Sequence, residues 1–209
     1  MKVRRLAARS AAAWRARGWR AVRCRLDRLW LTGLRYILKF DAWHAAAPYS
    51  CRPYKKTVVE LANSLRPQLA VEIGCGLGDI LSRIRARERL GFDTELAVVR
   101  AARWLHPVCA RWIHGDAAAV LRYTAQSRRI DCLIMVNWTH NLSPERLAAC
   151  LLPLLPRVRH LIVDAIKPDA PGTYRFRHDF QFLGDSAQRI ANVPVADEPR
   201  SLIVFKILA

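Results

Sequence analysis

The feature that most restricts the fold of this chain is a glycine-rich segment, VEIGCGLGDI, at residues 71–80. Gly74, Gly76 and Gly78 directly follow Leu69–Ile73, an apolar run that predicts a buried strand. Glycine has no Cβ, so a bend made of glycines lets backbone N–H groups approach a ligand closely. In an open parallel sheet, ligands bind at the carboxyl ends of the strands. The segment therefore predicts a ligand site in a protein of the α/β class.

After Pro48, short β-rich runs alternate with helical stretches. This alternation predicts right-handed crossovers and a Rossmann-like, mostly parallel sheet with helices on both faces. Two final runs have prolines but no helix between them, so they predict a closing hairpin-like pair of antiparallel strands and a sheet of seven. We expect strands at 69–73, 89–92, 111–114, 131–138, 160–166, 188–193 and 201–208, and helices at 58–65, 78–87, 95–104 and from Ser143 toward Leu155.

Two acids stand at predicted strand ends. Asp93 lies 19 residues beyond Gly74, which suits an acid that accepts hydrogen bonds from ribose hydroxyls. Asp116 follows the third strand, where an adenine amino group could be bound. The spacing G-x-G-x-G differs from the G-x-G-x-x-G of dinucleotide sites, so a nicotinamide site is the weaker alternative.

The ordered motifs VEIGCGLG, GFD, HGD and DCLIMVNW resemble those of class I S-adenosylmethionine-dependent methyltransferases, over roughly residues 57–208. The resemblance implies methyl transfer with S-adenosyl-L-methionine as the cofactor. It also implies that the cofactor is held by residues of the glycine segment and of the following strand ends. These are Glu72, Gly74, Cys75, Gly76, Gly78, Asp93, Gly115, Asp116 and Asn137.

The catalytic candidates are Asn137, His140 and His178. Asn137 ends the fourth strand, but the two prolines of enzymes that methylate nucleic-acid amino groups do not follow it. We therefore expect O-methylation of a small molecule or of a sugar or glycolipid acceptor, with a histidine as general base. His140 and His178 are each candidates, the latter with Asp179 and Asp164, and a structural role remains open for both. No metal site is expected, since close ligand pairs are missing.

The segment before the domain is strongly basic. Residues 1–40 contain twelve Lys or Arg and one acid, a net charge of +11 out of +18 for the chain. A stripe from Trp19 to Leu38 predicts an amphipathic helix that packs on the domain, lies on an anionic membrane, or binds nucleic acid. Arginines interrupt every apolar run, which excludes a membrane span or secretory signal here. We predict an arm at 1–45 and a catalytic domain at 46–209.

The segment joining arm and domain carries Tyr49, Arg52, Tyr54 and Lys55, which either form a plain linker or cover the site. The six cysteines form no C-x-x-C pair, so we expect reduced thiols and a cytoplasmic protein, with peripheral contact at the inner membrane surface as an extension. Two other functions stay open: an RNA methyltransferase using the arginine-rich arm, and a non-catalytic S-adenosylmethionine-binding protein. The sequence makes no prediction of oligomeric state.

Overall fold

The computed structural model describes residues 2–124, 128–170 and 172–208, with side chains from residue 18 onward. The chain divides into two compact units, residues 1–52 and 53–209. The first contains α1 (Lys2–Leu38), α2 (Ala42–Ala46) and the 3-10 helix η1 (Tyr49–Cys51). The helices of the second are α3 (Pro53–Ser64), η2 (Leu81–Arg83), α4 (Leu96–Leu105), α5 (Ala117–Tyr123), η3 (Thr139–Asn141), α6 (Pro144–Leu151), η4 (Leu155–Arg157) and η5 (Gln181–Ser186).

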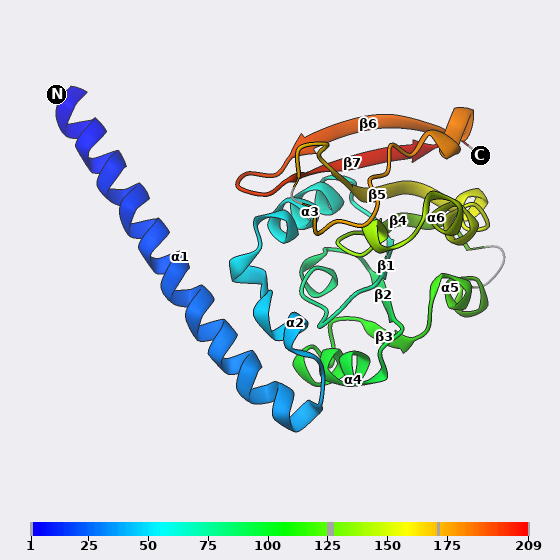
Figure 1. The fold of residues 1–209 in the computed structure, drawn as a ribbon, viewed down its shortest axis with the longest axis horizontal. Helices are drawn as coiled ribbons and strands as arrows, with labels where there is room; N and C mark the ends of the chain where they lie inside the picture. Colours follow the sequence, from blue (N-terminus) through cyan, green and yellow to red (C-terminus); the bar gives the residue numbers. More distant parts are fainter. Residues whose placement is uncertain (1, 125–127, 171, 209) are drawn as a thin grey trace. The chain divides into compact units, whose positions relative to one another are not determined.

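A mixed seven-stranded sheet forms the centre of residues 53–209 (Figure 1). Its order is β3-β2-β1-β4-β5-β7-β6, and β7 is antiparallel to both of its neighbours. The fold class predicted from the sequence is therefore confirmed, including the final antiparallel pair. The strands are β1 (Leu69–Ile73), β2 (Glu88–Asp93), β3 (Arg111–His114), β4 (Ile130–Met135), β5 (Val158–Ile166), β6 (Ala187–Pro194) and β7 (Arg200–Ile207).

The central strands are buried because helical layers cover both faces of the sheet. All five residues of β1 are buried, as a strand with an apolar layer on each side requires. On one face, α5, α6 and the η5 segment pack their apolar side chains on alternate residues of β1, β4, β5 and β7. On the other, α4 contacts β2 and β3, and α3 contacts β7. Ser143 caps α6 through its side chain and Pro144 opens the helix, as the sequence predicts.

Three sequence-based expectations about secondary structure were wrong. The helix expected at 78–87 is absent, and the turn after β1 contains only the 3-10 helix η2. Glu72 accepts a hydrogen bond there from Leu81 N at 3.2 Å, so a buried side chain takes up one N–H of that turn. β4 ends at Met135, three residues earlier than expected, and α3 begins at Pro53, five residues earlier than expected. The earlier end of β4 and the earlier start of α3 leave the glycine segment at the carboxyl end of β1.

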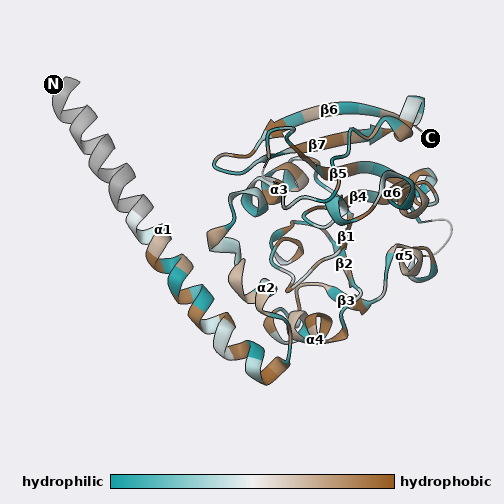
Figure 2. Cartoon of the chain, in the orientation of Figure 1, coloured by the Kyte–Doolittle hydropathy of each residue, from teal (hydrophilic) through white to brown (hydrophobic). Residues whose placement is uncertain are grey.

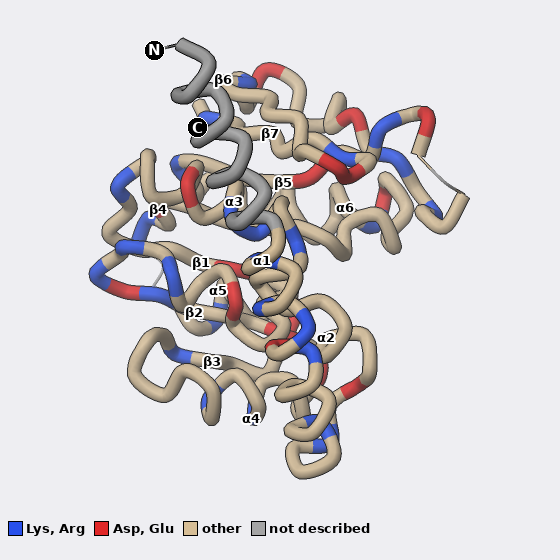
Figure 3. The backbone as a smooth tube through the Cα atoms, turned by 90° about the vertical axis from the view of Figure 1, so that its left-hand side faces the viewer, with Lys and Arg blue, Asp and Glu red and all other residues tan. Residues whose placement is uncertain are grey.

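In the first unit, α1 is tied to the segment that follows it by a disulfide between Cys24 and Cys51. The expectation of six reduced thiols is therefore wrong for this pair, because the helical turn brings two cysteines 27 residues apart in sequence into contact. Asp27 also accepts a hydrogen bond from Ser50 at 2.6 Å, and Arg28 donates to Ala46 O at 3.0 Å. From residue 18 onward, apolar and polar residues are interspersed along α1 (Figure 2), and the basic residues of this part are marked in Figure 3.

Candidate active site

The glycine segment forms a tight loop at the carboxyl end of β1. Gly74, Gly76 and Gly78 all have positive φ, at 72°, 54° and 82°, a region that residues with a Cβ adopt only with strain. Gly74 N and Cys75 N both donate to Phe92 O, at 2.8 and 3.0 Å. The loop is thus bound to the end of β2, as expected for a strand-end ligand site.

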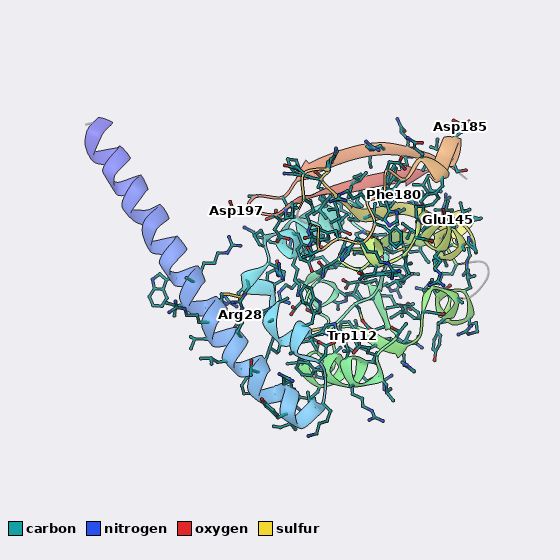
Figure 4. All side chains as sticks on the ribbon, in the orientation of Figure 1. Arg28, Trp112, Glu145, Phe180, Asp185 and Asp197 are labelled. Carbon is teal, nitrogen blue, oxygen red and sulfur yellow. A yellow bond between two sulfur atoms is a disulfide. The ribbon has the colours of Figure 1, made fainter. Side chains whose placement is uncertain are left out.

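Two tryptophans lie where side chains of the loop would otherwise be. A Cβ on Gly74 would come within 2.4 Å of the Trp138 indole, and a Cβ on Gly78 within 2.5 Å of the Trp112 ring. Trp112 lies on β3 and is labelled in Figure 4. Trp138 donates from Nε1 to Ile73 O at 2.6 Å. The close packing of the two indoles explains why glycine is required at these two positions. It also gives Trp138 a packing role.

Asp93 fixes the loop from the neighbouring strand. Its Oδ2 accepts from Gly76 N at 2.9 Å and its Oδ1 from Glu95 N at 3.0 Å. The side chain is buried at the end of β2. A carboxylate has about four lone-pair sites, so these two bonds leave it able to accept further hydrogen bonds from ligand hydroxyls.

Glu72 and Lys55 lie beneath the loop. Burial raises the pKa of Glu72 well above its ordinary value, while the Lys55 ammonium and the Leu81 N–H oppose that rise. Lys55 Nζ itself lies 2.6 Å from Asp79 Oδ2 in an ion pair that is mostly buried. Of the linker residues, Lys55 thus contacts the loop directly. Burial also raises the pKa of the Cys75 thiol, so Cys75 stays protonated and is no nucleophile.

The third strand end has a different geometry. The Asp116 side chain accepts from Ala119 N at 3.1 Å and is the N-cap of α5. Gly115 N donates to Asp93 O at 2.9 Å, which joins this loop to the second strand end. A Cβ on Gly115 would come within 2.5 Å of Ala119 Cβ. The structure thus brings the predicted cofactor residues on β1, β2 and β3 to one edge of the sheet.

The fourth strand end lies on the other side of β1, at the point where the strand order reverses. Asn137 has φ of 70°, which asparagine tolerates better than most residues. Its N–H donates to Asp164 Oδ1 at 3.0 Å, and its Oδ1 accepts from Arg200 at 2.9 Å. Asn137 is thereby held rigidly beside the loop after β1.

Arg200 at the start of β7 is the main residue that sequence reasoning missed. It is 2% exposed and donates to Asp164 Oδ2 at 2.8 Å. Its Nε lies 3.1 Å from Glu198 Oε2 as an ion pair without hydrogen-bond geometry, and its guanidinium carbon lies 4.6 Å from the Tyr54 ring centroid. The sequence feature that could have identified it is an arginine that opens the final apolar strand directly after Pro199.

The two candidate histidines lie in neighbouring segments of the same layer. His178 is buried and its Nε2 lies 3.0 Å from Thr139 O, so this nitrogen carries the proton and donates to the carbonyl. Asp179 accepts a hydrogen bond from Gln181 N at 3.0 Å. His178 bonds to the backbone of Thr139 and not to Asp179. Phe176 N donates to His140 O, which joins the 174–180 segment to η3.

His140 is half-buried and lies edge-on to Tyr174, with ring centroids 5.0 Å apart. Its Nδ1 is buried and has no hydrogen-bond partner among the residues that the structure describes. Burial lowers the pKa of His140; the Asp164 carboxylate opposes that change, and Arg200 and His178 reinforce it. The imidazole is therefore neutral near pH 7 and able to accept a proton.

The loop after β1 lacks the long helix that a pyrophosphate ligand uses. Dinucleotide sites place the pyrophosphate at the N-terminus of a helix directly after the glycine turn. Here residues 74–87 contain only the three-residue η2. The geometry therefore favours a ligand held by acids and backbone groups over one held by its phosphates.

Solved structures of methyltransferases share this fold at low sequence identity. N-methyltransferase NodS from Bradyrhizobium japonicum WM9, in complex with S-adenosyl-L-homocysteine, matches with a TM-score of 0.66 and 14% identity over 85% of this chain and 98% of that chain. Magnesium protoporphyrin IX methyltransferase from Synechocystis PCC 6803, with the same molecule bound, matches with a TM-score of 0.60 and 16% identity over 74% and 84%.

The mitomycin 7-O-methyltransferase MmcR matches with a TM-score of 0.61 and 13% identity, over 79% of this chain and 56% of that chain. No protein-family model matches the sequence. No curated protein matches it either. At these identities the likeness establishes the fold.

Proposed function

We propose that this chain is an S-adenosyl-L-methionine-dependent methyltransferase. The observation that carries the proposal is the loop of Gly74, Gly76 and Gly78, all with positive φ, tied to Asp93 at the end of the next strand. The fold is shared with methyltransferases solved with S-adenosyl-L-homocysteine bound, which supports the same class of ligand. The short turn after the loop argues against a dinucleotide.

The residues present fit this cofactor. Asp93 retains acceptor capacity for ribose hydroxyls after its two backbone bonds. Gly74 and Gly76 offer a loop surface without Cβ atoms, and buried Glu72 holds the turn from beneath. When bound, the cofactor supplies a methyl group on a positively charged sulfur. We assign its binding to Glu72, Gly74, Cys75, Gly76, Gly78, Asp93, Gly115, Asp116 and Asn137, of which Cys75 contributes its backbone.

The acceptor we propose is a hydroxyl group of a small molecule or of a sugar or glycolipid. A hydroxyl must lose its proton as its oxygen is methylated, so it requires a base. His140 is neutral near pH 7 because its pKa is lowered, and its Nδ1 has no partner among the described residues. An unpaired buried nitrogen is costly, and a substrate hydroxyl reaching Nδ1 would remove that cost. We therefore assign the proton transfer to Nδ1 of His140.

His178 and Asn137 then act as positioning residues. His178 holds the backbone of Thr139 next to the base, through its bond to Thr139 O. Asn137 is fixed by Asp164 and Arg200 at the switch point of the sheet. Holding the acceptor and the base rigidly is the main contribution a protein makes to a displacement of this kind.

Calorimetry with the full chain tests the cofactor assignment. We expect S-adenosyl-L-methionine and S-adenosyl-L-homocysteine to bind, and NAD not to bind. Asp93→Asn should weaken binding of both nucleosides. The matched control is Asp131→Asn, because Asp131 lies near the amino end of β4, away from the carboxyl ends of the strands where the site lies. Heat from NAD alone, with none from either sulfur nucleoside, would refute the proposal.

Methyl transfer identifies the acceptor. The chain is incubated with radiolabelled S-adenosyl-L-methionine and a cell extract fractionated into lipid, glycan, RNA and small molecules. We expect label in the lipid, glycan or small-molecule fraction, lost in His140→Gln. Label confined to RNA would support the RNA alternative. Cofactor binding with no label in any fraction would support the non-catalytic alternative.

A further inference from the structure

One long apolar stripe on α1 remains exposed within residues 18–52. At 100° per residue, its members fall within an arc of about 100° on the helix. Their exposed fractions range from 47% to 75%, far above those of packed apolar side chains. The stripe consists of Trp19 (73%), Val22 (47%), Leu26 (61%), Leu29 (70%), Trp30 (59%) and Ile37 (75%).

The stripe is separate from the side of α1 that holds the following segment. Cys24, Asp27 and Arg28 provide that attachment, through the disulfide and the bonds to Ser50 and Ala46. Cys24 and Asp27 lie on the side of the helix roughly opposite the stripe. Trp19, Val22, Leu26 and Leu29 take part in none of these bonds, and their exposed side chains are left for another contact.

Basic side chains border the stripe on both sides. Arg23 and Arg25 flank it, and both are exposed. Arginine can lay its aliphatic stem along an apolar surface while its guanidinium reaches outward to phosphate. Tryptophan prefers the boundary between headgroups and hydrocarbon. A stripe of Leu, Ile, Val and Trp between arginines is the composition of a helix that lies flat in an anionic membrane surface.

A second copy of α1 suits the stripe poorly. Trp19, Val22, Leu26 and Leu29 do follow heptad spacing, so a helix pair is the obvious rival. Arg23 and Arg25 occupy the flanking e and g positions, however, and Asp27 is the only acid in residues 1–40. An antiparallel pair would set arginine against arginine, and a parallel pair offers these arginines no acid.

Nucleic acid also fits less well. Phosphates would pair with the arginines, but the aliphatic residues at the centre of the stripe, Leu26 and Leu29, would stay in water. Among the described residues, no helix is long and apolar enough to cross a bilayer. A bilayer whose surface is anionic is the occupant that satisfies both the charge and the apolar stripe.

We propose that α1 binds the surface of an anionic lipid bilayer, with this stripe inserted at the level of the headgroups. Trp19, Leu26 and Leu29 supply the apolar contact, and Arg23 and Arg25 pair with lipid phosphates. This inference concerns residues 18–38 alone and does not depend on the chemistry of the site on β1 and β2. It holds whether or not the acceptor is itself a lipid.

Vesicle sedimentation of the full chain tests the proposal. The probes are vesicles of phosphatidylcholine alone and of equal parts phosphatidylcholine and phosphatidylglycerol. We expect binding to the mixed vesicles that weakens with added salt and is far weaker with neutral vesicles. Leu26→Gln with Leu29→Gln should reduce the partition coefficient at least about tenfold, because two exposed leucines no longer enter the bilayer.

Two matched controls separate the stripe from general surface effects. Val108→Gln with Leu152→Gln removes two exposed aliphatic side chains from residues 53–209 and should leave vesicle binding unchanged. Arg23→Gln with Arg25→Gln should reduce binding by about tenfold, and Arg122→Gln with Arg146→Gln should reduce it less. Circular dichroism verifies that each variant keeps its helix content, since glutamine is a good helix former.

Three outcomes would overturn the proposal. The first is equal binding to both vesicle types, or binding that survives the double leucine substitution. The second is a stable dimer in solution that the same substitution dissociates, with no vesicle binding by the wild type. The third is that neither the wild type nor the leucine variant binds vesicles, while the leucine substitution abolishes binding to single-stranded RNA. Loss of vesicle binding in both, with a melting temperature of residues 53–209 that the substitution lowers, would count in the same way.

Discussion

Replacing Arg200 tests the buried charge cluster that holds Asn137. Arg200 and Asp164 are each 2% exposed and 2.8 Å apart, so Arg200→Leu leaves the Asp164 carboxylate buried without its cation. Removing one partner of a buried ion pair costs about 3–5 kcal/mol of stability. For a domain of this size that corresponds to a fall of about 6–20 °C in melting temperature.

The assay is thermal unfolding of the full chain, followed by calorimetry and far-UV circular dichroism. Arg200→Leu is compared with Asp164→Asn and with the double variant. Because the double variant no longer buries the Asp164 charge, we expect it to recover at least about 1 kcal/mol relative to the sum of the two single losses. Arg122→Leu, an exposed arginine on α5, is the control and should change stability by less than about 0.5 kcal/mol.

The reasoning would be refuted by either of two results. A loss below about 1 kcal/mol for Arg200→Leu would show that the pair is not buried as the structure has it. Strict additivity in the double variant would show that Arg200 and Asp164 do not interact, and that the loss came from packing alone.

Three further predictions concern the loop, the base and the disulfide. Gly74→Ala should abolish nucleoside binding and lower the free energy of unfolding by at least about 1–2 kcal/mol, because its φ is 72° and its new Cβ would lie 2.4 Å from Trp138. Gly172→Ala, whose Cβ would have nothing within 4 Å, is the control, and calorimetry and thermal melting should show neither effect. The methylation rate should rise with pH through an inflection below about 6.5, since burial lowers the pKa of His140 and only its neutral form accepts a proton. A His140→Gln variant that kept both the rate and the inflection would exclude this base. Cys24→Ser should destabilise residues 18–52 by about 2–4 kcal/mol by releasing the 27-residue loop, seen as faster hydrogen exchange there, and unchanged exchange would contradict this.

The sequence by itself determined the fold class and the position of the ligand loop. Alternating strand and helix patterns are local, and so are the steric demands of Gly74, Gly76 and Gly78, so both can be read from neighbouring residues. Asp93 could be placed for the same reason, because it ends the strand that follows the glycine loop in sequence and neighbouring parallel strands end at the same edge of the sheet. The antiparallel ending of the sheet followed from the absence of a helix between the last two strands.

Tertiary structure alone decided which distant side chains meet. Arg200, Asp164 and Asn137 come from three separate strand ends, and a single sequence carries no record of their contact. The same holds for Cys24 and Cys51, which meet because the chain returns from α1 so that η1 lies against it. The helix expected after the glycine loop did not form, and in that turn Leu81 N donates to Glu72, a side chain of β1. The side of α1 that faces its attachment likewise depends on long-range contacts, and those contacts left the apolar stripe exposed.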